Sequence, residues 1–285
     1  MSLTLGTAPF GPHAAGEWNF DYDGPGHALY LHPHARRVRA VFAGETVLDT
    51  LRPHLLHETG YLPRYYLPRE DVRWELFEPT DHSTHCPFKG DARYWTLRVG
   101  DRMAENVVWN YPEPVEGAPN FSELVSFYWD QLDHWYEEDE EVFVHPRDPF
   151  HRVDVLPTSR RVRVSLEGTE LADTSRAQVL YETGLPPRWY IPPEDVRGEA
   201  LVDSDTRTGC AYKGFASYKS VKAGVNAGGA TEEDLVWLYE DPLREAAPIK
   251  GHLAFFNERA DIEIDGELQE RPVTQWSQRP RSRAA

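Results

Sequence analysis

The sequence predicts a mainly β protein made of two homologous domains in tandem, with a few short helical turns. Shifted by 124 residues, the chain aligns with itself without a gap from about residue 18 to 94, and 28 of the 59 positions between 36 and 94 are identical. A period of this length is too long for a solenoid and indicates a duplicated domain. Polar and apolar residues alternate along most segments, which is typical of strands with one buried face. No segment has four clear turns of helical i, i+3, i+4 spacing.

The strand pattern recurs at matching places in the two copies. "RVRAVF" (37–42) and "RVRVSL" (161–166) alternate polar and apolar residues and then reach a turn at Gly44 or Gly168. After a four-residue insertion in the second copy, "VVWNYPEP" at 107 meets "LVWLYEDP" at 235. We therefore expect corresponding strands in both domains.

Turns and short helices follow from proline and glycine. "PREDV" (68–72) and "PPEDV" (192–196) place proline ahead of acidic residues, which is typical of a single helical turn. Asp265 and Gly266 suit the positive φ angles of a tight turn, so residues 260–268 are predicted to form a hairpin. The segment 121–135 is ambiguous between strand and helix.

We expect four parts along the chain. The acidic run 136–143 is predicted to be a solvated edge or linker at the domain junction. The opening residues are rich in Gly and Pro, and the last fifteen contain four arginines with little to bury. The expected parts are a flexible N-terminal arm (1–17), a first β domain (18–141), a second β domain (142–270) and a disordered basic tail (271–285).

Composition narrows the classes of partner. A net charge of −17 argues against nucleic acid and anionic membranes, because phosphates would be repelled over most of the surface. No run approaches the roughly 20 apolar residues of a membrane span, and the first residues lack the pattern of a secretory signal. Two cysteines cannot form a disulfide framework. We expect a cytoplasmic protein without a cofactor; nothing in the sequence predicts its oligomeric state.

Lysine is rare here, and each copy places one three residues after its only cysteine. Cys86 precedes Lys89, and Cys210 precedes Lys213; of 30 basic residues only five are lysine, and Lys89 is the sole lysine before position 213. Where arginine is the default choice, a retained lysine indicates a need for a compact, titratable amine.

These motifs resemble a known family. "LPREDVRWEL", "THCPFKGDARYW" and "VVWNYPEP", with their second-copy counterparts, are similar to the family catalogued as domain of unknown function 427, over nearly all of both repeats. The resemblance implies a β architecture related to the β-tent, or Mss4-like, folds. In that group two antiparallel sheets meet at an angle, and several members hold a zinc ion or a small ligand between them.

The residues do not predict a metal site. Structural zinc needs about four Cys or His ligands, and neither repeat has two cysteines. His82, His85 and Cys86 lie close together in the first copy, but the second copy has Thr206 and Gly209 at the histidine positions. A shared metal site is therefore not expected.

The cysteines and lysines are the candidate catalytic residues. Cys86 and Cys210 are either thiolate nucleophiles beside an ammonium or small buried side chains. Lys89 and Lys213 either bind an anion or form an imine with a carbonyl substrate, or they lay an aliphatic stem over an aromatic ring.

Repeated aromatic residues define a candidate ligand pocket in each domain. They are either ordinary sheet core or, with the lysine and a threonine hydroxyl, the wall of a site for a flat ligand. Paired Arg and carboxylate residues, including Glu58 and Arg64, are interpreted as ion pairs that fix loops. The candidate ligand-binding residues are Thr84, Lys89, Tyr66, Tyr94, Trp109 and Tyr111 in the first copy, and Thr208, Lys213, Tyr190, Tyr218, Trp237 and Tyr239 in the second.

Three functional hypotheses remain open. Each domain binds a small anionic or aromatic molecule; or the protein is an enzyme that uses Cys86 or Lys89 as a nucleophile; or it is a non-catalytic scaffold for a protein partner.

Overall fold

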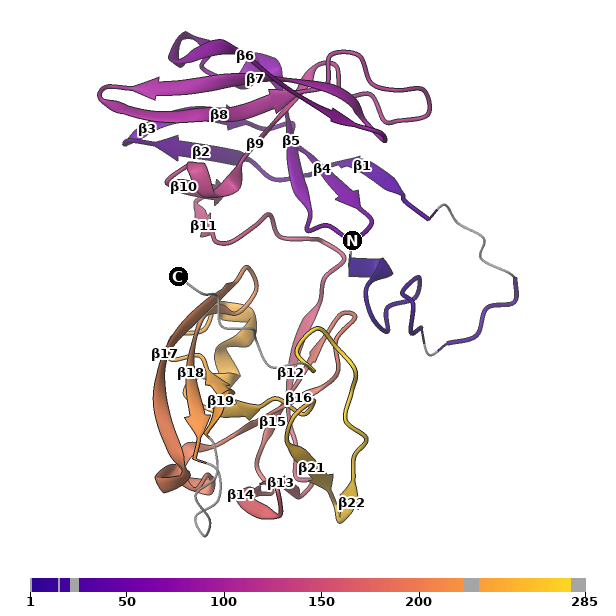
Figure 1. Cartoon of the computed structure of the whole chain (residues 1–285), viewed down its shortest axis with the longest axis vertical. Helices are drawn as coiled ribbons and strands as arrows, with labels where there is room; N and C mark the ends of the chain where they lie inside the picture. The colour runs from indigo at the N-terminus through magenta and orange to yellow at the C-terminus, as the bar shows by residue number, and fades with distance from the viewer. Residues whose placement is uncertain (1, 15, 21–25, 223–230, 278–285) are drawn as a thin grey trace. The chain divides into compact units, whose positions relative to one another are not determined.

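The computed structural model describes residues 2–14, 16–20, 26–222 and 231–277, which form two compact units (Figure 1). Of the described residues, those within Glu17–Asp148 form the first unit, and those within Ser2–Gly16 and Pro149–Ala285 form the second. The sequence had placed the boundary at 141/142, which lies within a strand of the first unit.

The first unit consists of two antiparallel sheets and three short 3₁₀ helices. Its seven-stranded sheet has the order β1-β4-β5-β9-β8-β7-β6, and its four-stranded sheet has the order β11-β10-β2-β3. The elements are β1 (Leu29–Pro33), β2 (Val38–Phe42), β3 (Glu45–Thr50), β4 (His54–Glu58), β5 (Arg64–Pro68), η2 (Arg69–Asp71), η3 (Trp74–Leu76), β6 (Phe77–Cys86), β7 (Gly90–Val99), β8 (Arg102–Asn110), β9 (Leu124–Phe127), η4 (Trp129–Gln131), β10 (His134–Glu137) and β11 (Glu140–Val142).

The second unit repeats this arrangement strand for strand. Its sheets have the orders β12-β15-β16-β20-β19-β18-β17 and β14-β13-β21-β22, and β17, β18 and β19 run side by side as β6, β7 and β8 do in the first unit (Figure 1). The elements are η1 (Ser2–Thr4), β12 (Val153–Pro157), β13 (Val162–Leu166), β14 (Thr169–Thr174), β15 (Gln178–Glu182), β16 (Arg188–Ile191), η5 (Pro193–Asp195), η6 (Gly198–Ala200), β17 (Leu201–Cys210), β18 (Gly214–Val221), β19 (Glu232–Leu238), η7 (Arg244–Ile249), β20 (Leu253–Phe255), β21 (Asp261–Ile264) and β22 (Glu267–Leu268).

The prediction of a duplicated, mainly β protein with short helical turns is therefore confirmed. Alternation explains the local structure: in β2, Val38, Ala40 and Phe42 are buried while the residues between them are half-buried. The hairpin expected around Asp265–Gly266 forms between β21 and β22. The ambiguous segment 121–135 forms β9, η4 and the start of β10.

Buried apolar side chains of the described residues form three clusters. One lies in the first unit and contains Val38, Leu67 and Leu97. A separate cluster of the first unit is mostly aromatic and contains Tyr66, Trp109 and six other buried residues. In the second unit a single large cluster includes the counterparts of both. The separate aromatic cluster is the part of the first unit that supports the candidate site.

Three terminal and junction segments differ in part from expectation. Of the two alternatives predicted for the acidic run 136–143, the structure has the sheet edge and not the linker: most of the run forms the β10–β11 hairpin with β11 at the edge, although Glu137 within it is buried. In the expected arm, Ser2–Gly16 groups with the second unit, and Ala8 is buried. In the expected tail, residues 271–277 pack on the second unit through Trp276, whereas residues 278–285 lie outside the described residues.

None of the helices in the described ranges is long and apolar enough to cross a bilayer.

Candidate functional site

A tight hairpin loop explains the spacing of Cys86 and Lys89. Strands β6 and β7 pair up to Cys86 opposite Gly90, and the backbone N–H of Lys89 donates to the Cys86 carbonyl oxygen at 3.2 Å. Gly90 has a φ of 108°, and a Cβ there would lie 2.8 Å from the backbone oxygen of Glu113. Gly214 closes the corresponding loop of the second unit with a φ of 93°. The recurrent motif thus encodes a three-residue hairpin loop that is followed by a glycine with a positive φ angle.

Lys89 is held by a carboxylate from a neighbouring strand. Its Nζ atom lies 2.6 Å from both Oε atoms of Glu58, at the end of β4, and only 7% of the lysine surface is exposed. His27 Nε2 lies 2.9 Å from Glu58 Oε1, and the His27 ring stacks on Phe88 with centroids 3.8 Å apart. The ammonium is therefore neutralised within the protein and is held rigidly against the loop.

The same trio recurs in the second unit. Lys213 Nζ donates to Glu182, His151 Nε2 lies 2.9 Å from Glu182 Oε1, and the His151 ring stacks on Tyr212 at 4.1 Å. Burial alone would raise the pKa of Glu182, but the charge of Lys213 and hydrogen bonds from His151 and Lys213 outweigh it and lower the pKa to about 2. In both units the histidine, glutamate and lysine follow one another at intervals of 31 residues.

The predicted residues of the first unit converge on one hollow of about 470 Å³, which we call the Trp109 pocket. Its wall includes five of the predicted ligand-binding residues and Cys86. Thr84 is not among the lining residues, and its hydroxyl lies 2.8 Å from that of Tyr94. The whole wall consists of His27, Leu56, Glu58, Tyr61, Leu62, Arg64, Tyr66, His85, Cys86, Pro87, Phe88, Lys89, Tyr94, Trp109, Tyr111 and Tyr128.

Three tyrosines of the pocket, Tyr66, Tyr111 and Tyr128, have raised pKa values. Burial raises the pKa of Tyr66 and of Tyr111 well above the ordinary value. Burial and then a hydrogen bond with Tyr94 raise the pKa of Tyr128 to about 12. These three residues therefore offer aromatic faces and neutral phenol hydroxyls to the pocket.

Arg64 brings a positive charge to this pocket. Its guanidinium lies 5.1 Å from the centroid of the Trp109 ring, and its Nη1 donates weakly to the Phe127 carbonyl oxygen at 3.4 Å. Within the described ranges Arg64 forms no ion pair with a carboxylate. The interpretation of Glu58 and Arg64 as members of loop-fixing ion pairs thus holds for Glu58, which pairs with Lys89, and is wrong for Arg64.

The second unit places its counterparts similarly, and Tyr190, Trp237 and Tyr239 are as buried as the matching residues of the first unit. These three residues belong to the large cluster of the second unit, and the Trp237 indole N–H donates to the Tyr190 hydroxyl at 2.9 Å. The Thr208 hydroxyl lies 2.9 Å from that of Tyr218. Cys210 is half-buried, as Cys86 is. The repeated aromatic set therefore contributes to the packed interior of the second unit, and its part in ligand binding stays a prediction.

A second hollow of about 540 Å³ adjoins the Trp109 pocket and shares Arg64 and Tyr128 with it. Its wall includes Trp129 and Trp135, whose rings stack with centroids 5.0 Å apart. Arg64 thus stands between two aromatic surfaces.

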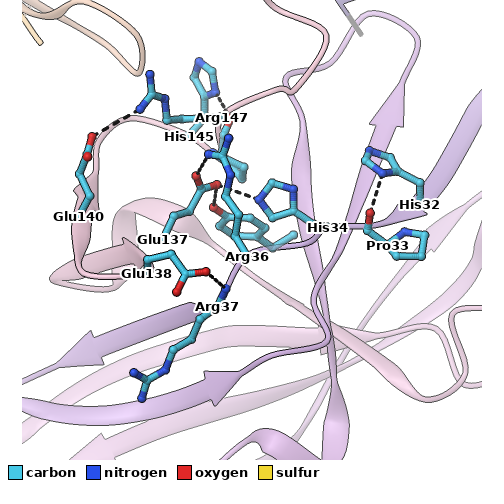
Figure 2. A network of polar contacts seen from close by, with 12 residues as sticks. His32, Pro33, His34, Arg36, Arg37, Glu137, Glu138, Glu140, His145 and Arg147 are labelled. Atoms are coloured by element: carbon cyan, nitrogen blue, oxygen red, sulfur yellow. Dashed lines mark hydrogen bonds and ion pairs between the residues drawn. The ribbon is translucent and has the colours of Figure 1, made fainter. Parts of the chain in front are cut away.

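A buried polar network supports the wall of this second hollow. Glu137 accepts hydrogen bonds from Tyr65 at 2.5 Å, from His34 at 3.1 Å and from Arg36, and Figure 2 shows the Arg36 and His34 side chains pointing toward it. Burial raises the pKa of Glu137, but these hydrogen bonds and the charge of Arg36 lower it overall. The network ties β10 to β5 and to the segment before β2.

No metal centre emerges from the described part of the chain, where no three His, Cys, Asp or Glu side chains are grouped as ligands. The sequence did contain one signal that was overlooked. His27 and His151 match at the same 124-residue shift as the other motifs, and both contact the pocket glutamate.

Comparison with known proteins agrees with this duplicated architecture. A search of curated proteins found no match. A family model described as "Domain of unknown function (DUF427)" matches twice, over residues 30–138 and 154–266, once within each unit. Because the two matches cover most of the sequence, the chain belongs to the DUF427 family as a tandem of two such domains.

Proposed function

We propose that the first unit is a binding module for a small molecule with an aromatic or anionic character, which occupies the Trp109 pocket. The observation that supports this proposal is that several aromatic side chains line one hollow together with Arg64, which forms no ion pair with a carboxylate of the described residues. A volume of about 470 Å³ lies in the range of small-ligand sites, which combine mostly apolar walls with a few polar groups.

The arrangement favours binding over lysine chemistry. An imine requires a free amine, and the Lys89 ammonium donates to both oxygens of Glu58. We therefore assign Lys89 to the wall of the pocket, where it fixes the loop that contains Cys86. The sequence predicted a ligand site in each domain; the proposal is restricted to the first unit because the counterpart of Arg64 is already paired with a carboxylate.

Thermal-shift screening of a metabolite library tests the proposal. Tyr61 lines the pocket and is 61% exposed, so Tyr61→Ala is expected to leave the fold intact and to weaken the binding of any hit. Tyr181→Ala is the matched control, because Tyr181 is also an exposed tyrosine and lies in the second unit. The proposal is wrong if hits stabilise Tyr61→Ala as strongly as the wild type.

A catalytic thiol is the second candidate, favoured by the presence of Cys86 in the pocket wall. An active thiolate would be alkylated faster than an ordinary cysteine and with a lower apparent pKa. Measuring the pH dependence of iodoacetamide modification in Cys86→Ser and Cys210→Ser separates the two thiols. Slow modification of Cys86, equal to that of Cys210, would remove this candidate.

A further inference from the structure

An arginine, a tryptophan and a third ring form the same stack in both units. In the first unit the Arg64 guanidinium lies 5.1 Å from the Trp109 centroid, and the Trp109 and Tyr128 rings are 4.7 Å apart. In the second unit Arg188 lies 5.5 Å from the Trp237 centroid, and Trp237 is 4.4 Å from Phe256. The residues of the two stacks occupy aligned positions in the two copies, so the stacks can be compared residue by residue.

The second stack is occupied by a carboxylate of its own chain. Nη1 and Nη2 of Arg188 each donate to one oxygen of Glu258 at 2.7 Å, and the Glu258 side chain has no exposed surface. Thr274 adds a hydrogen bond to Glu258 at 2.5 Å. This is the parallel two-bond geometry with which arginine recognises carboxylates.

The same chain segment adds an aromatic ring to that carboxylate. The Trp276 ring centroid lies 5.6 Å from the Arg188 guanidinium and 6.2 Å from the Phe256 ring. Residues 272–277 thus bring a planar apolar group to the place where Arg188 binds Glu258.

The first unit has the arginine but not its partners. Asp130 aligns with Glu258, yet it is one methylene shorter, is exposed, and forms no ion pair with Arg64 in the described part of the chain. Arg64 instead lines two adjoining hollows whose walls are rich in aromatic side chains, and Asp130 also lines the second of them.

Building on the proposed function, we propose that Arg64 binds the carboxylate of an aromatic carboxylic acid in the first unit. Glu258 and Trp276 occupy the equivalent place in the second unit, so that each chain binds one ligand. The second unit thereby shows which chemistry satisfies this stack: a carboxylate on the guanidinium with a planar ring beside it.

Titration calorimetry with phenylacetate and its neutral analogue phenylacetamide tests the role of Arg64. We expect one phenylacetate to bind per chain and no binding of phenylacetamide. Phenylacetate is expected to bind Arg64→Gln at least about tenfold more weakly than the wild type, because a charge-assisted pair is lost. Asp130→Asn is the matched control and is expected to bind phenylacetate at least as well as the wild type.

The outcomes separate this inference from the proposed function. Equal binding of phenylacetate and phenylacetamide by the wild type and Arg64→Gln would overturn the role of Arg64 and retain an aromatic pocket. Binding of neither compound to the wild type, together with failure of the library screen, would overturn both. Two phenylacetates per chain would contradict the occupied state of the second unit.

A rescue experiment tests the second unit independently. Glu258→Ala removes the carboxylate and leaves Arg188 buried without its counter-charge, with a hydrogen bond to Asn257 as its remaining polar contact among the described residues, so the melting temperature is expected to fall. Sodium acetate is expected to restore it beyond the effect of sodium chloride at equal ionic strength, and to have no such effect on the wild type. Equal effects of acetate and chloride on Glu258→Ala would overturn the proposed equivalence of the two stacks.

Discussion

The Nζ atom of Lys89 lies 2.6 Å from each carboxylate oxygen of Glu58, although the two residues are 31 positions apart and both side chains are largely buried. The pair joins the β6–β7 loop to the end of β4 and forms part of the wall of the Trp109 pocket. Its repetition as Lys213 and Glu182 indicates that the geometry belongs to the domain itself.

Breaking this pair on one side is expected to destabilise the protein strongly. Lys89→Met leaves the Glu58 carboxylate buried without its counter-charge, at a cost of about 3–5 kcal/mol in the free energy of unfolding. The double variant Lys89→Met/Glu58→Leu removes both charges and should recover much of this loss. Urea unfolding measures both.

Lys250→Met is the control for this experiment. Lys250 pairs with Asp241 in solvent, with 66% of its side chain exposed, so the change should cost no more than about 1 kcal/mol. A Lys89→Met variant that unfolds like this control would contradict the assigned role of the pair.

The acid stability of the second unit should depend on Glu182. Its pKa in the folded protein, about 2, lies below the ordinary value of 4.5, so between these pH values the carboxyl group binds fewer protons in the folded than in the unfolded state. The resulting stabilisation is complete above the unfolded pKa and is lost as pH falls from about 4.5 toward 2. Unfolding followed by tryptophan fluorescence between these pH values should show a smaller pH slope for Glu182→Gln, and an unchanged slope would contradict the assignment.

Gly90→Ala should be far more costly than the same change at Gly44. Both glycines have a positive φ, 108° and 80°, which an L side chain rarely adopts. Only at Gly90 does the new Cβ meet backbone, 2.8 Å from the oxygen of Glu113, whereas nothing lies within 4 Å of one at Gly44. Strain of about 1–3 kcal/mol is expected at either site, with a further loss at Gly90. Equal melting temperatures for the two variants would contradict this account of the loop.

The buried carboxylate of Glu137 should make Tyr65 important for stability. Tyr65→Phe removes the hydroxyl that donates to Glu137 at 2.5 Å, at an expected cost of about 1.5–3 kcal/mol. Tyr136→Phe is the control, because Tyr136 lies on the same strand as Glu137 and contacts Arg39 through its ring. Denaturant titrations in which both variants match the wild type would show that the network contributes little.

The fold could be predicted because the relevant signals are local or periodic. Alternation in segments such as 37–42 fixes strands, and the 124-residue shift fixes the number of domains without any knowledge of contacts. The acidic run 136–143 was predicted to be a solvated edge or linker, and the burial of Glu137 at this sheet edge was not anticipated, for a physical reason. Charge favours solvent in general, but Glu137 is buried by specific donors from His34, Arg36 and Tyr65, which lie far away in the sequence.

The sequence predicted which residues line the candidate site, but it did not predict which residues they pair with. Cys86, Lys89 and Trp109 were identified from a repeated motif, and the fold brings them to one pocket. The pairing of Lys89 with Glu58 depends on the placement of β4 beside the β6–β7 loop, which no spacing rule specifies. Likewise, Arg188 pairs with Glu258 whereas Arg64 does not pair with Asp130, although Asp130 and Glu258 occupy aligned positions and are both acidic. This contrast depends on long-range packing.

The indole N–H resonance of Trp109 provides the most direct test of a ligand site in the first unit. In two-dimensional ¹H–¹⁵N spectra of the full chain, Trp109→Phe and Trp237→Phe assign the two signals. The account predicts that a compound identified by the thermal-shift screen moves the Trp109 signal and leaves the Trp237 signal in place. Compounds that bind yet leave the Trp109 signal unmoved, or that shift only the Trp237 signal, would contradict it.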